Sequence, residues 1–389
     1  MIACTEQIVR SAALPHPIAL PLSGPSVLAF GADMKNAICL TSGTSALLGR
    51  PTGEVDDLGS LLASRECASR FERLLGVRPR IVAHDLHPDS RAANEARARA
   101  RRDNLPAVAV QHHHAHAAAC MADNAVPDGQ RVIGVCFDGT GYGADGTIWG
   151  GEFLICDYRG FHRASHLHPV PLPGGDAGIH CPYRMALSWM RHAGIPWTPD
   201  LPPAVAAGPD ERRVLDRQLR ARINTPLTSS MGRLFDAMAS LIGLCHRIAS
   251  EAEAPIALES LASEQSMSDD GAYAFERVGV AIDAGPVLRD AADDLRGGTS
   301  PSVIAARFHR GVARMVVDEC RRLREGWGVN DVALTGGVWQ NRVLVRMTGP
   351  ALEREGFRVL EHRCVPVHDG GIALGQAVVA LARLGGAGE

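Results

Sequence analysis

The order of predicted elements repeats along this chain, and the repeat limits the folds open to it. The first half predicts three short strands and then a helix, a strand, a helix, a strand and a helix, at 27–33, 37–42, 46–49, 57–76, 80–85, 91–102, 107–111 and after 111. Residues 131–170 predict three more strands joined by glycine-rich turns, and residues 302–389 alternate helices and strands again. Three antiparallel strands followed by alternating helices and parallel strands, twice over, predict a duplicated α/β unit.

This duplication predicts ribonuclease-H-like lobes that face each other, as in the actin, Hsp70 and sugar-kinase superfamily, with nucleotide held between them. A length of 389 residues suits several lobes with sizeable cores. We expect an N-terminal extension (1–24), a first lobe (25–130), a second lobe (131–170 and 301–389) and a mainly helical insertion (171–300).

Composition excludes several classes of protein. No apolar run approaches the roughly 18 residues of a membrane helix, and no signal peptide is evident. Ten cysteines lie scattered without a C-x-x-C pair, which argues against a zinc ribbon or a disulfide framework and fits the reducing cytoplasm. A net charge of −3 gives no basic footprint for nucleic acid. We therefore expect a cytoplasmic protein with neither a membrane nor a nucleic-acid partner.

Four histidines crowd into the stretch "VQHHHAH". His112 and His116 are spaced i,i+4, so on a helix they share one face and form a chelating pair. His113 and His114 point elsewhere, and we expect them to be partly buried or exposed. The metalloprotease pattern H-E-x-x-H requires a glutamate at the position of His113, so the sequence does not favour a zincin-type metalloprotease.

Two imidazoles need carboxylates to complete a metal site. Asp138 precedes Gly139 at the end of a predicted strand, and Asp369 precedes another Gly-Gly before a helix. Two histidines with one or two carboxylates suit Fe(II) or Zn(II) better than Mg(II).

Glycine-rich turns follow the strands that border the predicted cleft. "FDGTGYGADG" and "LTGGVWQN" set Gly139, Gly141, Gly336 and Gly337 at strand ends, where a backbone without side chains can approach a phosphate. A helix that starts near Asn341 would add its N-terminus. Lys35, the single lysine among 40 basic residues, follows the first strand, and we expect it near a phosphate or a charged reaction centre.

Five ordered motifs, "VQHHHAH", "FDGTGYGADGTIWGGEF", "PLPGGD", "SSMGRLFDAMASLIGL" and "LTGGVWQN", closely resemble the C-terminal part of the HypF family. Its members are the carbamoyltransferases of [NiFe]-hydrogenase maturation, related in this part to the universal tRNA threonylcarbamoyl transferases. The resemblance runs from about Val27 to the C-terminus. It implies transfer of a carbamoyl group from carbamoyl adenylate to the C-terminal cysteine of a partner protein, HypE.

The resemblance also implies the site residues. The family's metal ligands match His112, His116, Asp138 and Asp369. Its nucleotide contacts match Lys35, Gly139, Thr140, Gly141, Gly232, Asp236, Gly336, Gly337 and Asn341. No general base is evident, and His113 is the nearest candidate.

The sequence departs from the family in two respects. Full-length members carry acylphosphatase-like, zinc-finger and adenylating domains ahead of this part, which these 389 residues do not contain. We therefore expect carbamoylation to depend on carbamoyl adenylate supplied by an adenylating protein or a full-length relative. The family's E-G-x-A reads "EAEA", with Ala252 in place of glycine. A phosphotransferase, a small-molecule O-carbamoyltransferase and a non-catalytic scaffold that binds nucleotide or HypE remain open alternatives.

Overall fold

A computed structural model describes residues 16–51, 53–55, 58–250, 252–262 and 271–384. The first fifteen residues of the predicted N-terminal extension lie outside this part. The elements in chain order are β1 (Ile18–Ala19), β2 (Val27–Ala29), β3 (Cys39–Ser42), β4 (Ser45–Leu48), α2 (Leu58–Leu75), β5 (Ile81–Asp85), α3 (Arg91–Asp103), β6 (Ala107–Val110), α4 (His112–Asp123), β7 (Val132–Tyr142), β8 (Ile148–Cys156), β9 (Phe161–Leu167), β10 (Val170–Pro171), α5 (Asp176–His180), α6 (Pro182–His192), α7 (Pro202–Ala221), β11 (Leu227–Thr228), α8 (Met231–Leu241), α9 (Glu253–Leu261), β12 (Glu276–Val278), β13 (Ala281–Asp283), α10 (Gly285–Arg296), α11 (Pro301–Trp327), β14 (Asp331–Thr335), η2 (Gly337–Gln340), α12 (Arg342–Arg354), β15 (Arg358–Leu360), η3 (Asp369–Gly371) and α13 (Ile372–Leu384).

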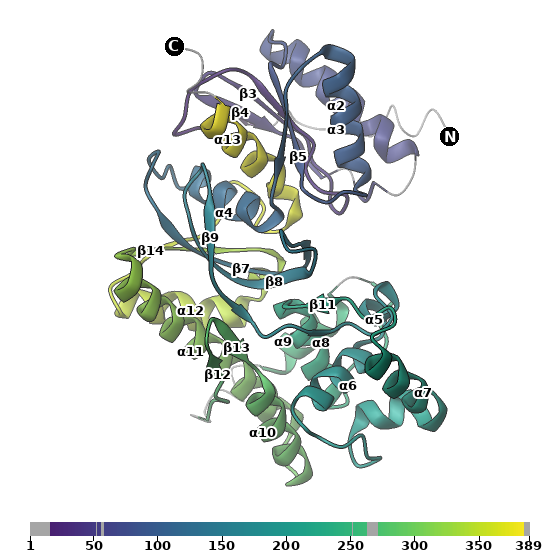
Figure 1. The fold of residues 1–389 in the computed structure, drawn as a ribbon. Coiled ribbons are helices and arrows are strands. Elements are labelled where there is room, and N and C mark those ends of the chain that lie inside the picture. Colours follow the sequence, from purple (N-terminus) through teal and green to yellow (C-terminus); the bar gives the residue numbers. More distant parts are fainter. Residues whose placement is uncertain (1–15, 52, 56–57, 251, 263–270, 385–389) are drawn as a thin grey trace.

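The first sheet has six strands in the order β1-β4-β3-β2-β5-β6. Strands β2, β3 and β4 pair antiparallel, whereas β5 and β6 run parallel to β2. Nearly all residues of β2, β3, β4 and β5 are buried, so both faces of the sheet are covered there, whereas β6 is partly exposed. Helices α2 and α3 contribute Phe71, Ala96 and Ala100 to a core on the face away from the second sheet (Figure 1).

The second sheet repeats this arrangement on a larger scale. Its nine strands follow the order β12-β13-β9-β8-β7-β14-β15, with β10 and β11 attached beside β8. Strands β7, β8 and β9 pair antiparallel, and β14 and β15 run parallel to β7. The predicted duplication of an α/β unit is confirmed.

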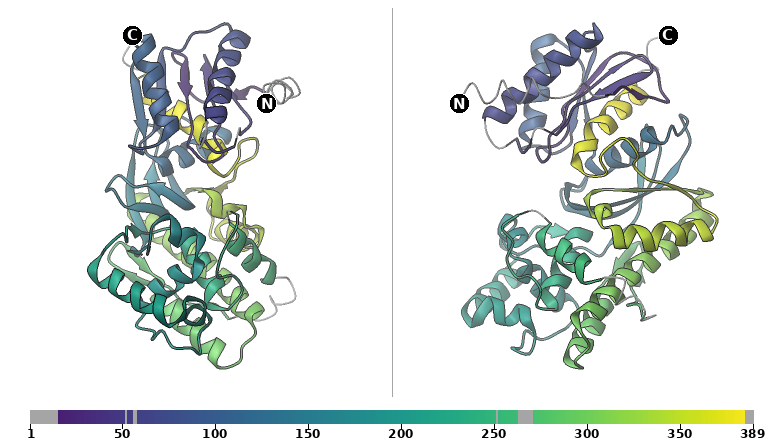
Figure 2. Two further views of the ribbon diagram at one scale, coloured as in Figure 1. Left: turned by 90° about the vertical axis from the view of Figure 1, so that its right-hand side faces the viewer. Right: turned by 180° about the vertical axis from the view of Figure 1, so that it is seen from behind.

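Helices α4 and α13 pack against each other between the two sheets, and Figure 2 shows α13 in yellow beneath the first sheet. Close contact requires small residues here: a side chain at Gly375 would collide with the backbone carbonyl of Ala115. Gln376 also hydrogen-bonds both backbone polar groups of Gly31, after β2. Helix α13 therefore lies on the first sheet, although the predicted boundaries gave all of 301–389 to the second lobe.

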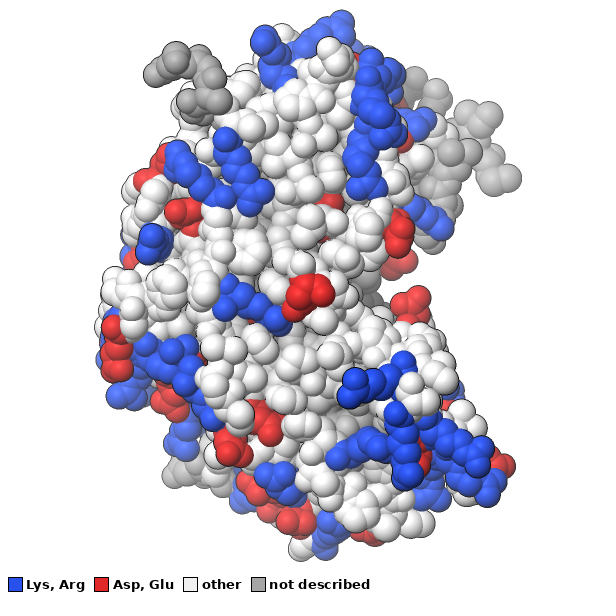
Figure 3. All heavy atoms as spheres, viewed as in Figure 1, with Lys and Arg blue, Asp and Glu red and all other residues white. Residues whose placement is uncertain are grey.

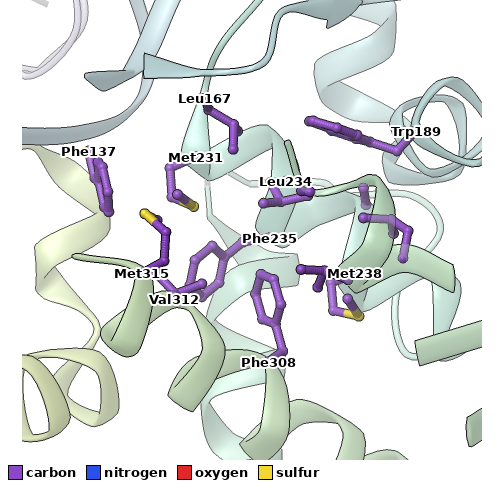
Figure 4. Close-up of a cluster of buried hydrophobic side chains, with 14 of the residues drawn as sticks. Phe137, Leu167, Trp189, Met231, Leu234, Phe235, Met238, Phe308, Val312 and Met315 are labelled. Carbon is purple, nitrogen blue, oxygen red and sulfur yellow. The ribbon is translucent and has the colours of Figure 1, made fainter. Parts of the chain in front are cut away.

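The insertion shares one hydrophobic core with the second sheet (Figure 4). Phe137 of β7 and Leu167 of β9 lie opposite Met231 and Phe235 of α8 and Phe308 of α11. The insertion also contributes β12 and β13, which extend the second sheet beyond β9 and were not predicted. This continuous core fixes the position of α8 relative to β7.

Candidate metal and nucleotide site

Four side chains converge between the lobes as candidate metal ligands. One ligand atom each from His112, His116, Asp138 and Asp369 lies within 4.8 Å of all the others. Nε2 of His112 and Nε2 of His116 lie 3.2 and 3.3 Å from Oδ2 of Asp138, and 3.9 and 3.5 Å from Oδ1 of Asp369. Helix α4, strand β7 and the turn before α13 supply them. The structure thus brings together all four residues predicted from the sequence.

The chemistry of this cluster fits a divalent transition metal. Nε2 of His116 is buried and has no hydrogen-bond partner among the described residues, although two carboxylates lie near it. Burial disfavours the charged imidazolium form of His112. The neighbouring carboxylates outweigh this effect of burial and raise the pKa of His112 well above the usual value. Burial likewise opposes the charged form of Asp138, but the two histidines hold its pKa well below the usual range. Two imidazoles and two carboxylates in a buried group are a donor set for Fe(II) or Zn(II).

Asp85, which sequence analysis missed, orients one of these ligands. Its Oδ2 lies 2.8 Å from Nδ1 of His112, which leaves Nε2 directed at the cluster. Asp85 ends β5 and pairs in register with Val110, two residues before His112. The sequence could have indicated Asp85, because it is an acid at the end of a strand that borders the cleft, and Asp138 was identified by that same criterion.

Glycines let the backbone place Asp138. The register of β7 against β8 shifts between Phe137 and Gly141, and this bulge re-aims the strand where Asp138 lies. Gly336 adopts a φ of +101°, and a side chain there would strike the carbonyl oxygen of Phe137. The N–H of Gly337 donates to Oδ1 of Asp138 over 3.0 Å. The Gly-Gly pair therefore anchors a candidate metal ligand, in addition to its predicted nucleotide contact.

His113 and His114 are fully buried, so the expectation that they would be partly buried or exposed was wrong. His114 reaches the carbonyl of Asp157 (2.6 Å), and burial lowers its pKa to about 4. A Cβ on Gly141 would come within 2.5 Å of the His113 ring, so this imidazole packs behind the glycine turn. Burial first, and the charge on His112 second, lower the pKa of His113 well below its usual value. These features favour packing over the predicted role of His113 as a base.

Two of the predicted nucleotide residues, Thr140 and Gly141, line the cavity beside the candidate metal ligands. Others lie around Asp138 and in α8. A Cβ on Gly232, in the first turn of α8, would approach Cα of Gly139 to 2.9 Å, so this contact requires a glycine at position 232. Asp236, one turn later, is fully buried, and its Oδ2 lies 2.9 Å from Nε of Arg233. Burial raises the pKa of Asp236 to about 6 although Arg233 opposes this, and neither carboxylate oxygen has a well-directed hydrogen bond in the described part. Both carboxylate oxygens of Asp236 can therefore accept further hydrogen bonds.

Asn341 and Lys35, two further predicted nucleotide residues, do not line the cavity beside the candidate metal ligands. Asn341 caps α12 by accepting the N–H of Leu344 through its side-chain oxygen, and its amide nitrogen lies 3.0 Å from Nε2 of His309. Lys35 has a left-handed backbone with φ of +46°. It follows Met34, which lines the cavity beside the metal ligands, but Lys35 itself does not line it.

A cavity of about 570 Å³ opens beside the metal ligands, between the first lobe, the second lobe and the insertion. In Figure 3 the outline is hollowed on the right between the first lobe and the insertion, with acidic side chains at both edges. The lining residues are Ala32, Asp33, Met34, Asp85, His87, Ser90, His112, Thr140, Gly141, Tyr142, Ile148, Leu172, Gly175, Asp176, Ile179, Pro226 and Asp369.

Fold and site together define a two-lobed α/β protein with a metal-ligand cluster at its interlobe cleft. The HypF Kae1-like domain matches residues 23–123, and the carbamoyltransferase Kae1-like domain, second subdomain, matches residues 134–376. The chain therefore belongs to the HypF carbamoyltransferase family.

Individual relatives agree with this assignment. Carbamoyltransferase HypF of Rhodobacter capsulatus is 43% identical over 97% of this chain, which spans 50% of that protein. A carbamoyltransferase HypF homolog of Cupriavidus necator is 36% identical and covered over 91% of both chains. The structure of a full-length HypF in a phosphate- and nucleotide-bound form superposes with a TM-score of 0.89 at 37% identity, over 96% of this chain and 58% of that one.

None of the helices in the described ranges is both long and apolar enough to cross a membrane. The nine cysteines that the structure describes are all free.

Proposed function

We propose that this chain is a carbamoyltransferase of hydrogenase maturation, which transfers the carbamoyl group of carbamoyl adenylate to the C-terminal cysteine of a HypE-type protein. Relatives that carry the carbamoyltransferase name, at 43% and 36% identity, support the reaction class. The observation that carries the proposal is the convergence of His112, His116, Asp138 and Asp369 beside a cavity that His112 and Asp369 line and that is large enough for an acyl group and its acceptor.

The four ligands would hold Fe(II) or Zn(II). Such an ion supplies Lewis acidity toward carbonyl or phosphate oxygens. The protein's own contribution is orientation: Asp85 fixes the ring of His112, and the backbone N–H of Gly337 fixes the carboxylate of Asp138. Both contacts keep the ligands in place before any substrate binds.

The adenine nucleotide would lie along the wall formed by Gly139, Gly232 and Gly337. Gly139 and Gly337 are partly exposed and carry no side chain, which suits the close approach of a phosphate, and the buried Gly232 packs against Gly139. Asp236 has unused acceptors that suit hydroxyl donors of a ribose. The nucleotide-bound state of the full-length HypF structure supports this assignment.

The proposed partners are a HypE-type protein and a source of activated carbamoyl groups, either an adenylating protein or a full-length relative. The acceptor must react as a thiolate, which in turn requires that its cysteine stay reduced. We therefore place the reaction in the cytoplasm.

An acceptor panel tests the proposal. The purified chain, loaded with Fe(II) or Zn(II), receives synthetic carbamoyl adenylate together with HypE, HypE whose C-terminal cysteine is replaced by alanine, a sugar, or an aminoglycoside. Intact-mass spectrometry should find one carbamoyl group on HypE and none on its cysteine-free variant, at a rate well above an enzyme-free control.

The other outcomes identify the alternatives. Carbamoylation of a hydroxyl compound in the absence of HypE would indicate a small-molecule O-carbamoyltransferase. Phosphorylation of a sugar with ATP would indicate a phosphotransferase. Binding of nucleotide or HypE with no rate above the control would indicate a scaffold.

A further inference from the structure

Two side chains from different lobes meet at the cavity beside the metal ligands. His87 follows β5 in the first lobe, and Tyr142 ends β7 in the second. Their ring centroids lie 5.0 Å apart with the planes tilted by 58°. Both line the cavity that His112 and Asp369 also line. Neither residue was predicted from the sequence.

Each of the two side chains carries a hydrogen-bond donor with no partner in the described part of the chain. Nδ1 of His87 lies 3.1 Å from the N–H of Asp89 and accepts its hydrogen bond. A neutral imidazole that accepts at Nδ1 carries its proton on Nε2. The hydroxyl of Tyr142 likewise has no hydrogen bond to another described residue. The pair thus offers an N–H and an O–H.

The backbone ties both donors to the start of α4, where the metal ligands begin. The N–H of His87 donates to Oδ1 of Asp85 over 2.9 Å, and Oδ2 of the same carboxylate holds Nδ1 of His112 over 2.8 Å. The carbonyl of Tyr142 accepts from the side-chain amide of Gln111 over 3.0 Å, and Gln111 caps α4. Each donor therefore has a fixed place relative to the metal-ligand pair, as preorganised stabilisation of charge requires.

The acidic lining of the cavity explains how these neutral donors could help a substrate bind. Its lining includes four aspartates and neither lysine nor arginine. The one hydroxyl nearest the first-lobe acids is already used, because Ser90 donates to Asp33 over 2.8 Å. An oxygen of a substrate that enters this cavity would meet carboxylates on several sides. His87 and Tyr142 supply neutral donors that can offset this repulsion without adding a mobile charge.

We propose that His87 and Tyr142 form a donor pair that binds the carbonyl oxygen of the transferred carbamoyl group; this rests on the proposed function. The acceptor thiol first loses its proton to solvent. Its sulfur then attacks the carbamoyl carbon, a C–S bond forms, and the carbonyl electrons move to the oxygen that the pair holds. When the C=O bond re-forms, the C–O bond to phosphate breaks and AMP leaves with the electron pair. Both donors keep their protons throughout.

Calorimetry with two ligands tests the pair without turnover. The probes are AMP, which lacks the carbamoyl group, and 5′-O-(N-carbamoylsulfamoyl)adenosine, a stable mimic that contains it. His87→Ala should weaken the mimic by about fivefold and leave AMP unchanged, the effect of one lost hydrogen bond. Tyr142→Phe should act in the same direction. His87→Gln, whose amide can reach the Nε2 position, should recover most of the affinity, and all variants should keep their metal.

Transfer to HypE provides the second readout. Removing one donor should lower kcat about 100-fold with little change in the KM for HypE, as for other lost oxyanion donors. Unchanged affinity for the mimic in both His87→Ala and Tyr142→Phe would overturn the pair while leaving the proposed function intact. Loss of metal from His87→Ala would also overturn it, by making His87 a support of the metal site. Wild-type protein that binds neither compound would overturn the proposed function and the pair together.

Discussion

The metal side and the nucleotide side of the cleft are built in different ways. On the candidate metal side, side chains form the ligand set: Nε2 of His116 has no hydrogen-bond partner among the described residues, and Asp85 holds His112 in orientation. On the nucleotide side, most predicted residues also maintain the fold, as when Asn341 caps α12 and Gly232 packs on Gly139. A ligand set made of side chains can be read from residue types and spacing. A site made of close backbone approach can be changed only by also disturbing the fold.

The largest expected effect lies on the metal side. His112→Ala should remove bound metal, because a single imidazole of an i,i+4 pair chelates weakly. His114→Ala is the matched control: it removes an equally buried histidine from the same helix but leaves the ligand set complete. Elemental analysis of both purified variants checks this. Equal metal content in the two variants would contradict the assignment of the ligands.

The second expected effect couples the two sides. A Cβ on Gly337 would lie 2.9 Å from Oδ1 of Asp138, whereas one on Gly139 would meet only a guanidinium nitrogen of Arg233 at 3.7 Å. Gly337→Val should therefore abolish nucleotide binding and also deplete metal by displacing Asp138. Gly139→Ala should keep its metal. Calorimetry with AMP and metal analysis measure the two effects. A Gly337→Val variant that loses nucleotide but keeps its metal would show that the two sides are independent, and one that keeps both ligands would contradict the prediction.

The third expected effect is smaller and concerns orientation alone. Asp85→Asn keeps the shape of the side chain but removes the charge that holds Nδ1–H of His112. Loss of such a partner typically weakens metal binding by about 10- to 100-fold. Competition with a chelator should give an affinity between those of the wild type and His112→Ala. Wild-type affinity in Asp85→Asn would mean that packing alone orients the ring.

Sequence reasoning was strongest where local pattern and function coincide. The i,i+4 spacing on α4 and the acids before Gly residues located all four candidate ligands, which lie in three separate stretches of the chain. The duplicated order of elements also predicted both sheets, because three antiparallel strands followed by parallel ones leave few topologies.

The misses share a physical cause, namely packing between distant segments. Periodicity cannot show that α13 crosses to the first sheet, because contacts between distant segments, such as that of Gln376 with Gly31, decide it. It also gave no reason for His113 and His114 to be fully buried, because their partners are Asp157 and a glycine turn far along the chain. The donor pair of His87 and Tyr142 likewise arises only when the lobes meet.

The fourth prediction concerns pH and the wall behind Asn341. His309 is fully buried and burial lowers its pKa to about 4, below the usual 6.5. The unfolded chain therefore takes up this proton first on acidification, so the contribution is complete above pH 6.5 and is lost as the pH falls toward 4. Between pH 6.5 and 5, wild type should lose about 2 kcal/mol of unfolding free energy that His309→Gln does not lose.

Urea unfolding of both proteins at the two pH values measures this difference. Other buried histidines titrate equally in the two proteins, so their contributions cancel in the comparison. His309→Gln should be less stable at neutral pH, and the gap should narrow on acidification. A gap that stays constant would mean that His309 does not remain neutral in the folded protein.

The smallest expected effect lies at Ala252, where this sequence has alanine in place of the glycine of the E-G-x-A pattern. Ala252 precedes α9 with φ of +60° and ψ of +11°, a left-handed conformation that costs a residue with a Cβ about 1 kcal/mol relative to glycine. Ala252→Gly, which restores the family's residue, should therefore raise the free energy of unfolding, by somewhat less than that cost because glycine also gains freedom in the unfolded chain. Ala257→Gly, inside the same helix, should have the opposite sign and cost about 1 kcal/mol. Urea unfolding of the two variants in parallel measures both changes. If both variants lose stability, Ala252 does not adopt the left-handed conformation in solution, and its substitution for glycine leaves the helix start unstrained.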